Sequence, residues 1–157
     1  MSLTDSQLNV VLAKAVPGYH GAFSKDELAS LKKRLPGFYI VNLEDAFDHK
    51  TGKQLPGSHW VTLHVGKTRC DYCDSYGADP PAPVVKFCGG LPLFFSNAVI
   101  QGLNSDNCGR FCASIIWQMW SRKKAMSTVV SEFSRRTGVN DKRVEAQWRA
   151  LRRGVGR

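Results

Sequence analysis

One stretch in the second half of the chain restricts the fold more than any other, because it indicates where a helix begins. Residues 104–107 read Asn-Ser-Asp-Asn, side chains that favour helix caps and turns over helix interiors. Directly after them, apolar side chains recur at helical spacing, at Phe111, Cys112, Ile115, Ile116 and Met119. The pattern predicts a central helix over residues 108–121 with one buried face. Cys108 would open this helix, where the helix dipole favours a negative charge by about 0.3–1 kcal/mol.

A thiol in this position is a candidate nucleophile, and the rest of the chain holds the groups that such a nucleophile needs. Free cysteine is mostly protonated at neutral pH and reacts well only beside an activating group such as an imidazole. His59 is the candidate general base, and Asp74 would orient its imidazole and stabilise the charged form. Gln101, together with the Cys108 backbone N–H, would donate to the oxyanion that forms when a carbonyl is attacked.

Each of these residues alone has a common structural explanation. A cysteine at the start of an apolar helix is often a small core residue, and Asp-Ser-Tyr-Gly from residue 74 is rich in turn formers. The joint pattern, in the order His, Asp, Gln, Cys, indicates thiol-dependent acyl transfer and differs from the papain order, in which the cysteine comes first. His64 and Asp71 are rivals for the base and the acid, but residues 59 and 64 of one strand point to opposite faces.

The run at residues 101–112, QGLNSDNCGRFC, resembles the nucleophile motif of the adenovirus endopeptidase (adenain) family. The wider superfamily includes the proteases specific for SUMO and ubiquitin-like proteins. Upstream, residues 38–42 and 57–61 (FYIVN and GSHWV) are similar to the strand and the His-Trp strand of that family. Asp74-Ser75 is similar to the Asp-Ser pair of the SUMO-protease branch, whereas adenovirus enzymes carry Glu there. The resemblance covers roughly residues 19–120.

The resemblance implies a role for each matched residue. Cys108 would be the nucleophile, His59 the base, Asp74 the orienting acid and Gln101 the oxyanion donor. The Trp neighbour and the Asp-Ser context favour His59 and Asp74 over their rivals. Trp60 would bind substrate by helping to cover a narrow channel.

The resemblance also implies a function. The chain would be a viral cysteine endopeptidase that cleaves virion precursor proteins at sites containing small residues such as glycine. It would work in the virion and in the infected host cell, in the nucleus, and would not be secreted. It would need no cofactor, although DNA or a short peptide would be a possible activator, and Cys88 is a weak candidate for a disulfide to such a peptide. Two alternatives stay open: an isopeptidase that removes ubiquitin or SUMO, and a non-enzymatic DNA-binding virion protein.

Length and composition fit one globular domain in a reducing compartment. The chain has 157 residues, of which 43% are hydrophobic and 22% charged, enough for one core. No apolar run approaches the ~20 residues of a membrane span, so no membrane contact is expected. Five cysteines cannot all pair with one another. Cys70, Cys73, Cys108 and Cys112 could together form a zinc site, but their contexts lack knuckle features, so we predict no metal.

Local patterns predict an α+β fold, with a small mixed or antiparallel sheet packed on the central helix. Residues 1–37 would supply N-terminal helices (4–15, and a second from residue 24 to Pro36), residues 38–121 the catalytic core, and residues 122–157 a basic helical segment. Strands are expected at 38–43, 58–65, 68–74 and 93–100, a polar loop at 44–57, and irregular chain at 78–92. Two C-terminal helices, 128–136 and 141–153, would be separated by Thr137-Gly138-Val139-Asn140. A hairpin of the second and third strands would bring His59 beside Asp74.

Positive charge is concentrated at the C-terminal end. Residues 122–157 contain eleven Lys and Arg against three Asp and Glu, an excess of eight in a chain of net charge +9. Such asymmetry favours an acidic partner, and non-specific nucleic acid is the first candidate. The residues expected to bind it are Arg122, Lys123, Lys124, Arg135, Arg136, Lys142, Arg143, Arg149, Arg152 and Arg153. A sequence-specific helix–turn–helix is less favoured, because the basic residues are not confined to one helix.

Overall fold

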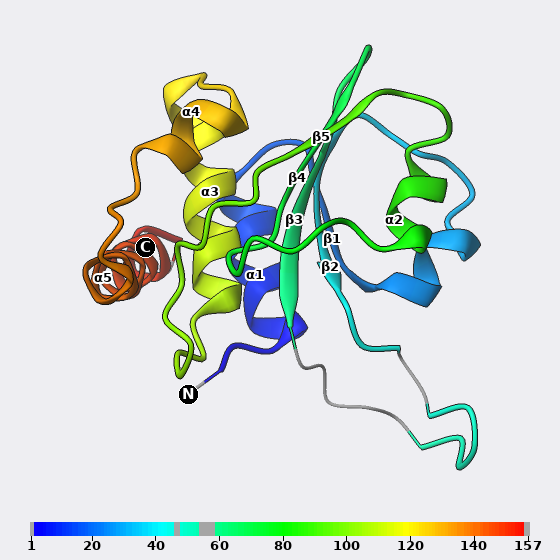
Figure 1. Ribbon diagram of the computed structural model, residues 1–157, viewed down its shortest axis with the longest axis horizontal. Coiled ribbons are helices and arrows are strands. Elements are labelled where there is room, and N and C mark those ends of the chain that lie inside the picture. Colours follow the sequence, from blue (N-terminus) through cyan, green and yellow to red (C-terminus); the bar gives the residue numbers. More distant parts are fainter. Residues whose placement is uncertain (1, 46–47, 54–58, 156–157) are drawn as a thin grey trace.

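A five-stranded mixed sheet with helices on both faces forms the molecule, seen in a computed structural model that describes residues 2–45, 48–53 and 59–155 (Figure 1). The strand order follows the chain: β1 (Tyr19–Ser24), β2 (Gly37–Asn42), β3 (Trp60–Val65), β4 (Cys70–Cys73) and β5 (Leu93–Phe95). The inner pairs β2–β3 and β3–β4 are antiparallel, and the outer pairs β1–β2 and β4–β5 are parallel. The predicted α+β class and mixed sheet are confirmed.

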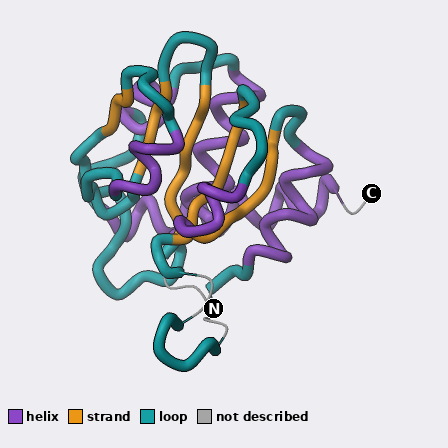
Figure 2. Tube along the Cα trace, turned by 90° about the vertical axis from the view of Figure 1, so that its right-hand side faces the viewer, coloured by secondary structure: helices purple, strands orange, loops and turns teal. Residues whose placement is uncertain are grey.

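The helix that begins with Cys108 and three other helices cover one face of the sheet (Figures 1 and 2). They are α1 (Asp5–Ala15), α3 (Cys108–Arg122), α4 (Met126–Ser131) and α5 (Thr137–Val155). Every residue of α3 from Phe111 to Ile116 is buried, so this part of the helix is covered all round, by β3 and α1 on one side and by α5 on the other. The apolar positions that the helical period identified are buried, but the sequence did not show that α5 also covers the opposite side of the helix.

The opposite face of the sheet carries a thinner layer. It consists of a 3₁₀ helix, η1 (Lys25–Ser30), and the short α2 (Ala82–Phe87). Leu28 from η1 and Val84 from α2 are buried against Val41 and Leu63 of the sheet. Because strand side chains alternate, the same strands supply both apolar layers, which is why β2 and β3 are apolar almost throughout.

Several boundaries follow the sequence closely. Thr4 caps α1 in a capping box with Gln7, and Cys108 opens α3 as predicted. The hairpin β3–β4 is also confirmed, with Thr62 opposite Cys73 in an antiparallel register. Residue 58, the predicted start of β3, and residues 46–47 and 54–57 of the predicted loop lie outside the described residues.

Other boundaries were wrong. The predicted irregular segment 78–92 contains α2, because proline in the first helical turn loses no hydrogen bond and Pro83 stands there. β1 was missed, since its side chains are all half-buried and show no alternation. In place of the predicted second N-terminal helix, which was to run from residue 24 to Pro36, the structure has only the 3₁₀ helix η1. β5 is three residues long instead of eight.

The C-terminal helices also differ from the prediction. α4 ends at Ser131, well before residue 136, and α5 begins at Thr137, inside the stretch that was expected to separate two helices. Asn140 explains the difference, because its side chain accepts from Ser134 N–H and donates to Ser134 C=O. A polar residue that suggested a break therefore fastens the helix start to the preceding turn. None of the helices in the described part of the chain is long and apolar enough to cross a membrane.

Candidate active site

The β3–β4 hairpin brings the predicted base and acid together. His59 directly precedes β3, and Asp74 directly follows β4, so the antiparallel pairing places both at the same end of the sheet. The Nε2 of His59 lies 2.7 Å from the Oδ1 of Asp74, whose side chain is 2% exposed. The same carboxylate oxygen accepts the Tyr76 N–H at 2.8 Å, and the Tyr76 ring stacks on the imidazole with centroids 4.9 Å apart. The imidazole is thus fixed from its edge and from its face.

The environment of His59 favours its charged form. Burial alone would lower the pKa of this imidazole, but hydrogen bonds to Asp74 and to the Cys108 side chain outweigh it and raise the pKa to about 9. With Nε2 on the carboxylate, Nδ1 is the ring nitrogen left to face the thiol. An imidazolium at neutral pH is what a neighbouring thiolate needs as its counter-ion.

Cys108 lies in the first turn of α3, where the sequence predicted it. Its side chain is buried, and its neighbour Gly109 packs so closely that an added Cβ would lie 3.3–3.5 Å from Leu3, Leu8 and Trp60. The preceding Asn107 makes no side-chain cap, and its carbonyl accepts from Phe111 N–H at 2.9 Å. The N–H groups of the first turn have no partners within the helix, so they and the helix dipole both favour an anion there.

Gln101 is buried and bound on both sides of its amide. Its Oε1 accepts from Ser75 Oγ at 2.5 Å, and its Nε2 donates to Ser105 O at 3.0 Å and to Ser105 Oγ at 3.2 Å. Tyr76 OH also donates to Ser105 O, at 3.1 Å. Gln101 therefore joins the turn after β4 to the loop before Cys108, and its role as oxyanion donor stays a prediction.

The sequence did not reveal a second set of polar residues, which bind the loop of residues 101–107 to α5. Asp141 accepts from Gly102 N–H at 3.0 Å, from Asn107 Nδ2 at 3.0 Å, and from Ser105 Oγ. Glu145 accepts from the same Asn107 amide at 2.9 Å. A four-residue spacing of two carboxylates on a helix was the available signal, but nothing in the sequence identified their partners.

The remaining sequence candidates lie elsewhere. His64 packs on Phe38 with ring centroids 4.8 Å apart, and Asp71 pairs with Arg69 at 2.7 Å, so neither rival joins the His59–Asp74 pair. Trp60 is 6% exposed and its Nε1 donates to Leu3 O at 3.2 Å. It lies in the core beneath the site, and its predicted part in binding substrate stays a prediction.

The five cysteines are all free and buried. Cys70 and Cys88 belong to one buried cluster on the α2 face, where burial raises the pKa of Cys88 to about 12. The predicted disulfide from Cys88 to a peptide stays untested. In the part of the chain that the structure describes, no three His, Cys, Asp or Glu side chains are grouped so that they could hold a metal ion.

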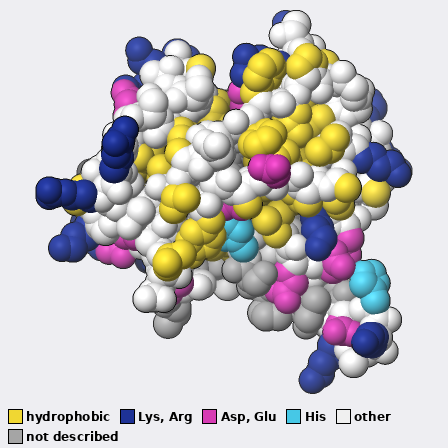
Figure 3. Space-filling model, viewed as in Figure 1, with side chains coloured by type: hydrophobic (Ala, Val, Ile, Leu, Met, Phe, Trp, Pro, Cys, Tyr) yellow, Lys and Arg dark blue, Asp and Glu magenta, His cyan; other side chains and the backbone are white. Residues whose placement is uncertain are grey.

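The basic C-terminal residues fall into two groups. Arg122 forms an ion pair with Glu132 at 2.6 Å, Arg143 donates to Gln118, and Lys123 lies over the Trp120 ring. The side chains of a second group are exposed and form no ion pair within the described residues: Lys124, Arg135, Arg136, Lys142, Arg149, Arg152 and Arg153. Arg149, Arg152 and Arg153 together line one hollow of about 340 Å³ on α5. On the face in Figure 3, Lys and Arg lie around the margin and hydrophobic side chains occupy the middle.

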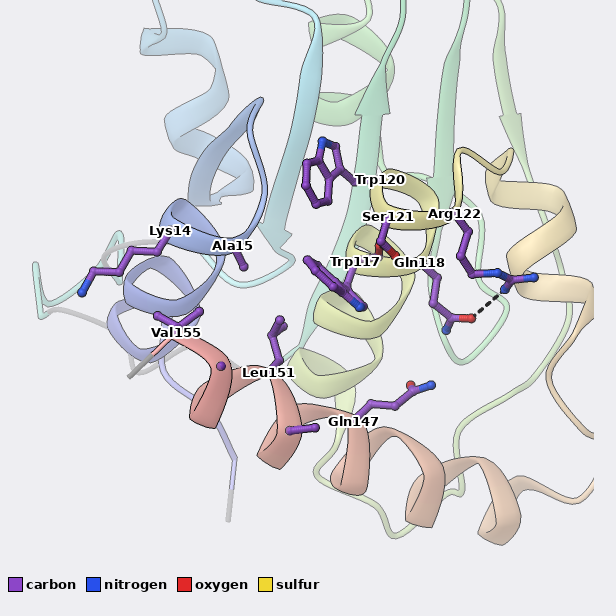
Figure 4. A pocket seen from close by; sticks show the side chains of 12 residues that line it. Lys14, Ala15, Trp117, Gln118, Trp120, Ser121, Arg122, Gln147, Leu151 and Val155 are labelled. Atoms are coloured by element: carbon purple, nitrogen blue, oxygen red, sulfur yellow. Dashed lines mark hydrogen bonds between the residues drawn. The ribbon is translucent and has the colours of Figure 1, made fainter. Parts of the chain in front are cut away.

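Among five hollows on the described part of the chain, the one with the greatest volume is separate from the thiol site. It is a groove of about 860 Å³ between α1, α3 and α5, lined among others by Trp117, Trp120 and Leu151 (Figure 4). None of the four candidate catalytic residues lines it. Cavity size alone would therefore have led to the wrong place, and the chemistry of the side chains identifies the site.

Comparison with known proteins supports the fold. No family model matches the sequence, and neither does any curated protein. Among solved structures, ChlaDub1 from Chlamydia trachomatis superposes with a TM-score of 0.50 at 13% identity, over 99% of this chain and 80% of that one. The selenomethionine structure of the ASFV pS273R protease gives a TM-score of 0.52 at 13% identity, over 89% and 65%. This chain has their fold. The second of these is a protease.

A second structure of the ASFV pS273R protease has a TM-score of 0.48 at 14% identity, over 79% of this chain and 57% of that one. The chain thus spans less than two thirds of either pS273R structure. At these identities the likeness concerns the fold, and the nearer resemblance to adenovirus enzymes, taken from the motif, stays a prediction.

Proposed function

We propose that this protein is a cysteine peptidase in which Cys108 is the nucleophile, His59 the base and Asp74 the orienting acid. The observation that carries the proposal is the imidazole of His59, which lies 2.7 Å from the buried Asp74 and close enough to Cys108 for both side chains to raise its pKa. Three residues from three separate segments converge at the start of a helix, where an anion is favoured. A structural core histidine would not require this arrangement.

The geometry supports the following sequence of steps. His59 holds the proton of the Cys108 thiol, and the thiolate attacks the scissile carbonyl carbon to form a tetrahedral oxyanion. The backbone N–H of Cys108 donates to this oxyanion, and Gln101 joins it by giving up one of its bonds to Ser105. His59 protonates the leaving amine as the C–N bond breaks. Water, deprotonated by His59, then hydrolyses the thioester and restores Cys108.

For the substrate we favour a precursor polypeptide cleaved at a glycine-containing site, in the virion and infected cell. The motif of residues 101–112 supports this choice through its resemblance to adenovirus enzymes. Four exposed hydrophobic side chains, two in β5 and two between β5 and Cys108, support a protein substrate: Phe94, Phe95, Val99 and Leu103. The likeness to ChlaDub1, a deubiquitinase, supports the alternative of an isopeptidase acting on a ubiquitin-like modifier.

The proposal is tested by comparing the wild type with Cys108→Ala. We expect the variant to lose hydrolysis of its substrates, and to lose rapid alkylation by iodoacetamide, while its thermal unfolding stays close to wild type. Cys112→Ala, a buried neighbour one helical turn later, is the matched control and should keep both reactions. Full activity in Cys108→Ala would refute the proposal.

The same preparation separates the alternatives. A thiol-reactive probe that ends in the Gly-Gly of ubiquitin or SUMO should label Cys108 only in the isopeptidase, whereas cut precursor proteins support the endopeptidase. In a non-enzymatic virion protein, Cys108 would react with iodoacetamide no faster than an ordinary thiol.

We also propose that the basic segment 122–157 binds nucleic acid through its phosphates. The exposed arginines of α5 support this, since Arg149, Arg152 and Arg153 share one hollow. Their spacing places several cations within about one turn of the helix, where they can contact neighbouring phosphates of a nucleic acid. Phosphate contacts of this kind do not depend on the base sequence. The ion-paired Arg122 is less suited to the role.

A further inference from the structure

Three side chains of α5 bind the loop that leads to the nucleophile. Asn140, 1% exposed, donates from Nδ2 to Ile100 O at 3.0 Å. Asp141 follows it and accepts from Gly102 N–H, Asn107 Nδ2 and Ser105 Oγ. Glu145 stands one turn further along and accepts from Asn107 as well. The loop is therefore held at its start, its middle and its end by one helix.

We propose that Asp141, supported by Glu145, is a positioning residue that fixes the loop 101–107 and thereby the place of Cys108. Where it concerns catalysis, this inference rests on the function proposed above. Asp141 touches neither the thiol nor the imidazole among the described contacts, so it would act through the loop and not on the substrate.

The chemistry of the contact favours a carboxylate at this position. Two carboxylate oxygens accept from three different donors, a backbone N–H, a hydroxyl and an amide. A carboxamide has one acceptor oxygen and two N–H groups, so it would oppose donor with donor in this place. Hydrogen bonds to an ionised acceptor are also stronger than neutral ones.

Gly102 makes the close approach possible. A Cβ on this residue would lie 3.0 Å from the Oδ2 of Asp141, which is tighter than ordinary van der Waals contact. The absence of a side chain at Gly102 thus lets its backbone N–H reach the carboxylate, which explains physically why glycine fits this position of the motif.

The position of the loop directly determines the position of Cys108. Asn107 N–H donates to Ser105 Oγ at 3.1 Å, and Asn107 O accepts from Phe111 N–H as the first bond of α3. Cys108 is the next residue, so a shift of Asn107 moves the thiol and its backbone N–H together. Displacements of about 1 Å in a reacting group can lower a rate by roughly 10²-fold.

The test compares Asp141→Asn with Glu132→Gln, each of which removes one negative charge. Glu132 pairs with Arg122 at the far end of α3 and does not contact the loop. In the whole protein we measure kcat and KM, the pH profile of Cys108 alkylation, and amide hydrogen exchange of residues 100–108.

For Asp141→Asn we expect kcat to fall about 10- to 100-fold with KM nearly unchanged. Alkylation of Cys108 by iodoacetamide should slow toward the rate of an ordinary thiol, because Cys108 loses its place beside the imidazole. Amide exchange at Gly102 and Asn107 should rise at least ~10-fold. Glu132→Gln should leave all three readouts at wild-type values.

A second variant keeps the inference testable if Asp141→Asn folds poorly. Ser105→Ala removes the hydroxyl that donates to Asp141, together with its bonds from Gln101 and Asn107, and leaves Asp141 in place. Because the two variants share the Ser105–Asp141 bond, the double variant should lose less than the sum of the two single losses. Wild-type exchange at residues 100–108 and a wild-type alkylation profile in both single variants would overturn the inference. A different pair of results would refute the proposed function and leave the structural role of Asp141 intact. In that case amide exchange rises in the variants, but Cys108 of the wild-type protein reacts no faster than a free thiol.

Discussion

His59 is the residue on which the chemistry depends, because its ring has a partner on each side. The buried Asp74 carboxylate and the Cys108 side chain together raise the pKa of an imidazole that burial alone would lower. Tyr76 adds a fixed face through its stacked ring and also binds the Asp74 carboxylate by its N–H. The result is a proton carrier that holds its proton at neutral pH.

This arrangement predicts the alkaline limit of activity. The protonated form of His59 dominates below its pKa of about 9, and kcat/KM should fall as the pH rises through that value and the leaving group loses its proton donor. In Asp74→Asn the hydrogen bond that raises the pKa is weakened, so the falling limb should move toward the ordinary imidazole value of 6.5. The measurement is the pH dependence of kcat/KM.

Asp71→Asn is the matched control, because Asp71 pairs with the exposed Arg69 and not with His59. Its profile should coincide with that of the wild type. An alkaline limb that stays in place in Asp74→Asn would contradict the role assigned to this carboxylate.

The element that places Asp74 is the turn between β4 and the segment that returns to the nucleophile. Gly77 N–H donates to Asp74 O at 2.8 Å and closes the turn. Gly77 has φ +78°, and a Cβ on it would lie 2.5 Å from Asn97 O. Both the left-handed backbone and the close carbonyl require glycine here.

Gly77→Ala should therefore destabilise the protein by about 2–4 kcal/mol, the sum of left-handed strain and a backbone clash, and should lower activity because Asp74 shifts. The free energy of unfolding in urea measures the first effect and kcat the second. Gly52→Ala separates strain from clash, since Gly52 has φ +68° but nothing within 4 Å of an added Cβ. It should lose only about 1 kcal/mol and no activity. Equal losses in both variants would exclude the contact with Asn97 as the cause.

At the scale of the whole molecule, α5 carries both the carboxylates that bind the loop before Cys108 and a group of exposed arginines. The side of α5 near its start carries Asp141 and Glu145 toward the nucleophile loop, while its later turns carry Arg149, Arg152 and Arg153. The excess of positive charge in residues 122–157 is thus unevenly distributed along α5, whose two ends differ in the charged groups they carry. The later turns, with Arg149, Arg152 and Arg153 around one hollow, are the part of α5 that we propose for binding a polyanion.

Replacing Arg149, Arg152 and Arg153 together by Gln should weaken binding of DNA at low salt and lower the slope of log K against log salt by about 3. The loss should be the same for DNA of any sequence, because phosphate contacts carry no sequence information. Fluorescence anisotropy of labelled duplexes over a salt series measures both. Arg122→Gln, which removes an ion-paired cation, should change the slope little. Wild-type binding by the triple variant would place the nucleic-acid site elsewhere or exclude it.

The sequence by itself determined the elements whose signals are local. A run of capping residues before helical periodicity defined the start of α3 at Cys108, and two apolar strands joined by a short turn predicted the hairpin that pairs His59 with Asp74. These features depend on residues a few positions apart, so propensity and periodicity suffice to find them.

The tertiary structure alone decided what holds the nucleophile in place. The bond from Asp141 to Gly102 joins residues 39 positions apart, and that from Glu145 to Asn107 joins residues 38 positions apart. No local pattern encodes such pairs, because each depends on how α5 packs beside α3. For the same reason the buried amide of Gln101, which the sequence marked as an oxyanion donor, is bound to Ser75 and Ser105. The chemistry of a side chain is set by its type, whereas its partners are set by the packing of the whole fold.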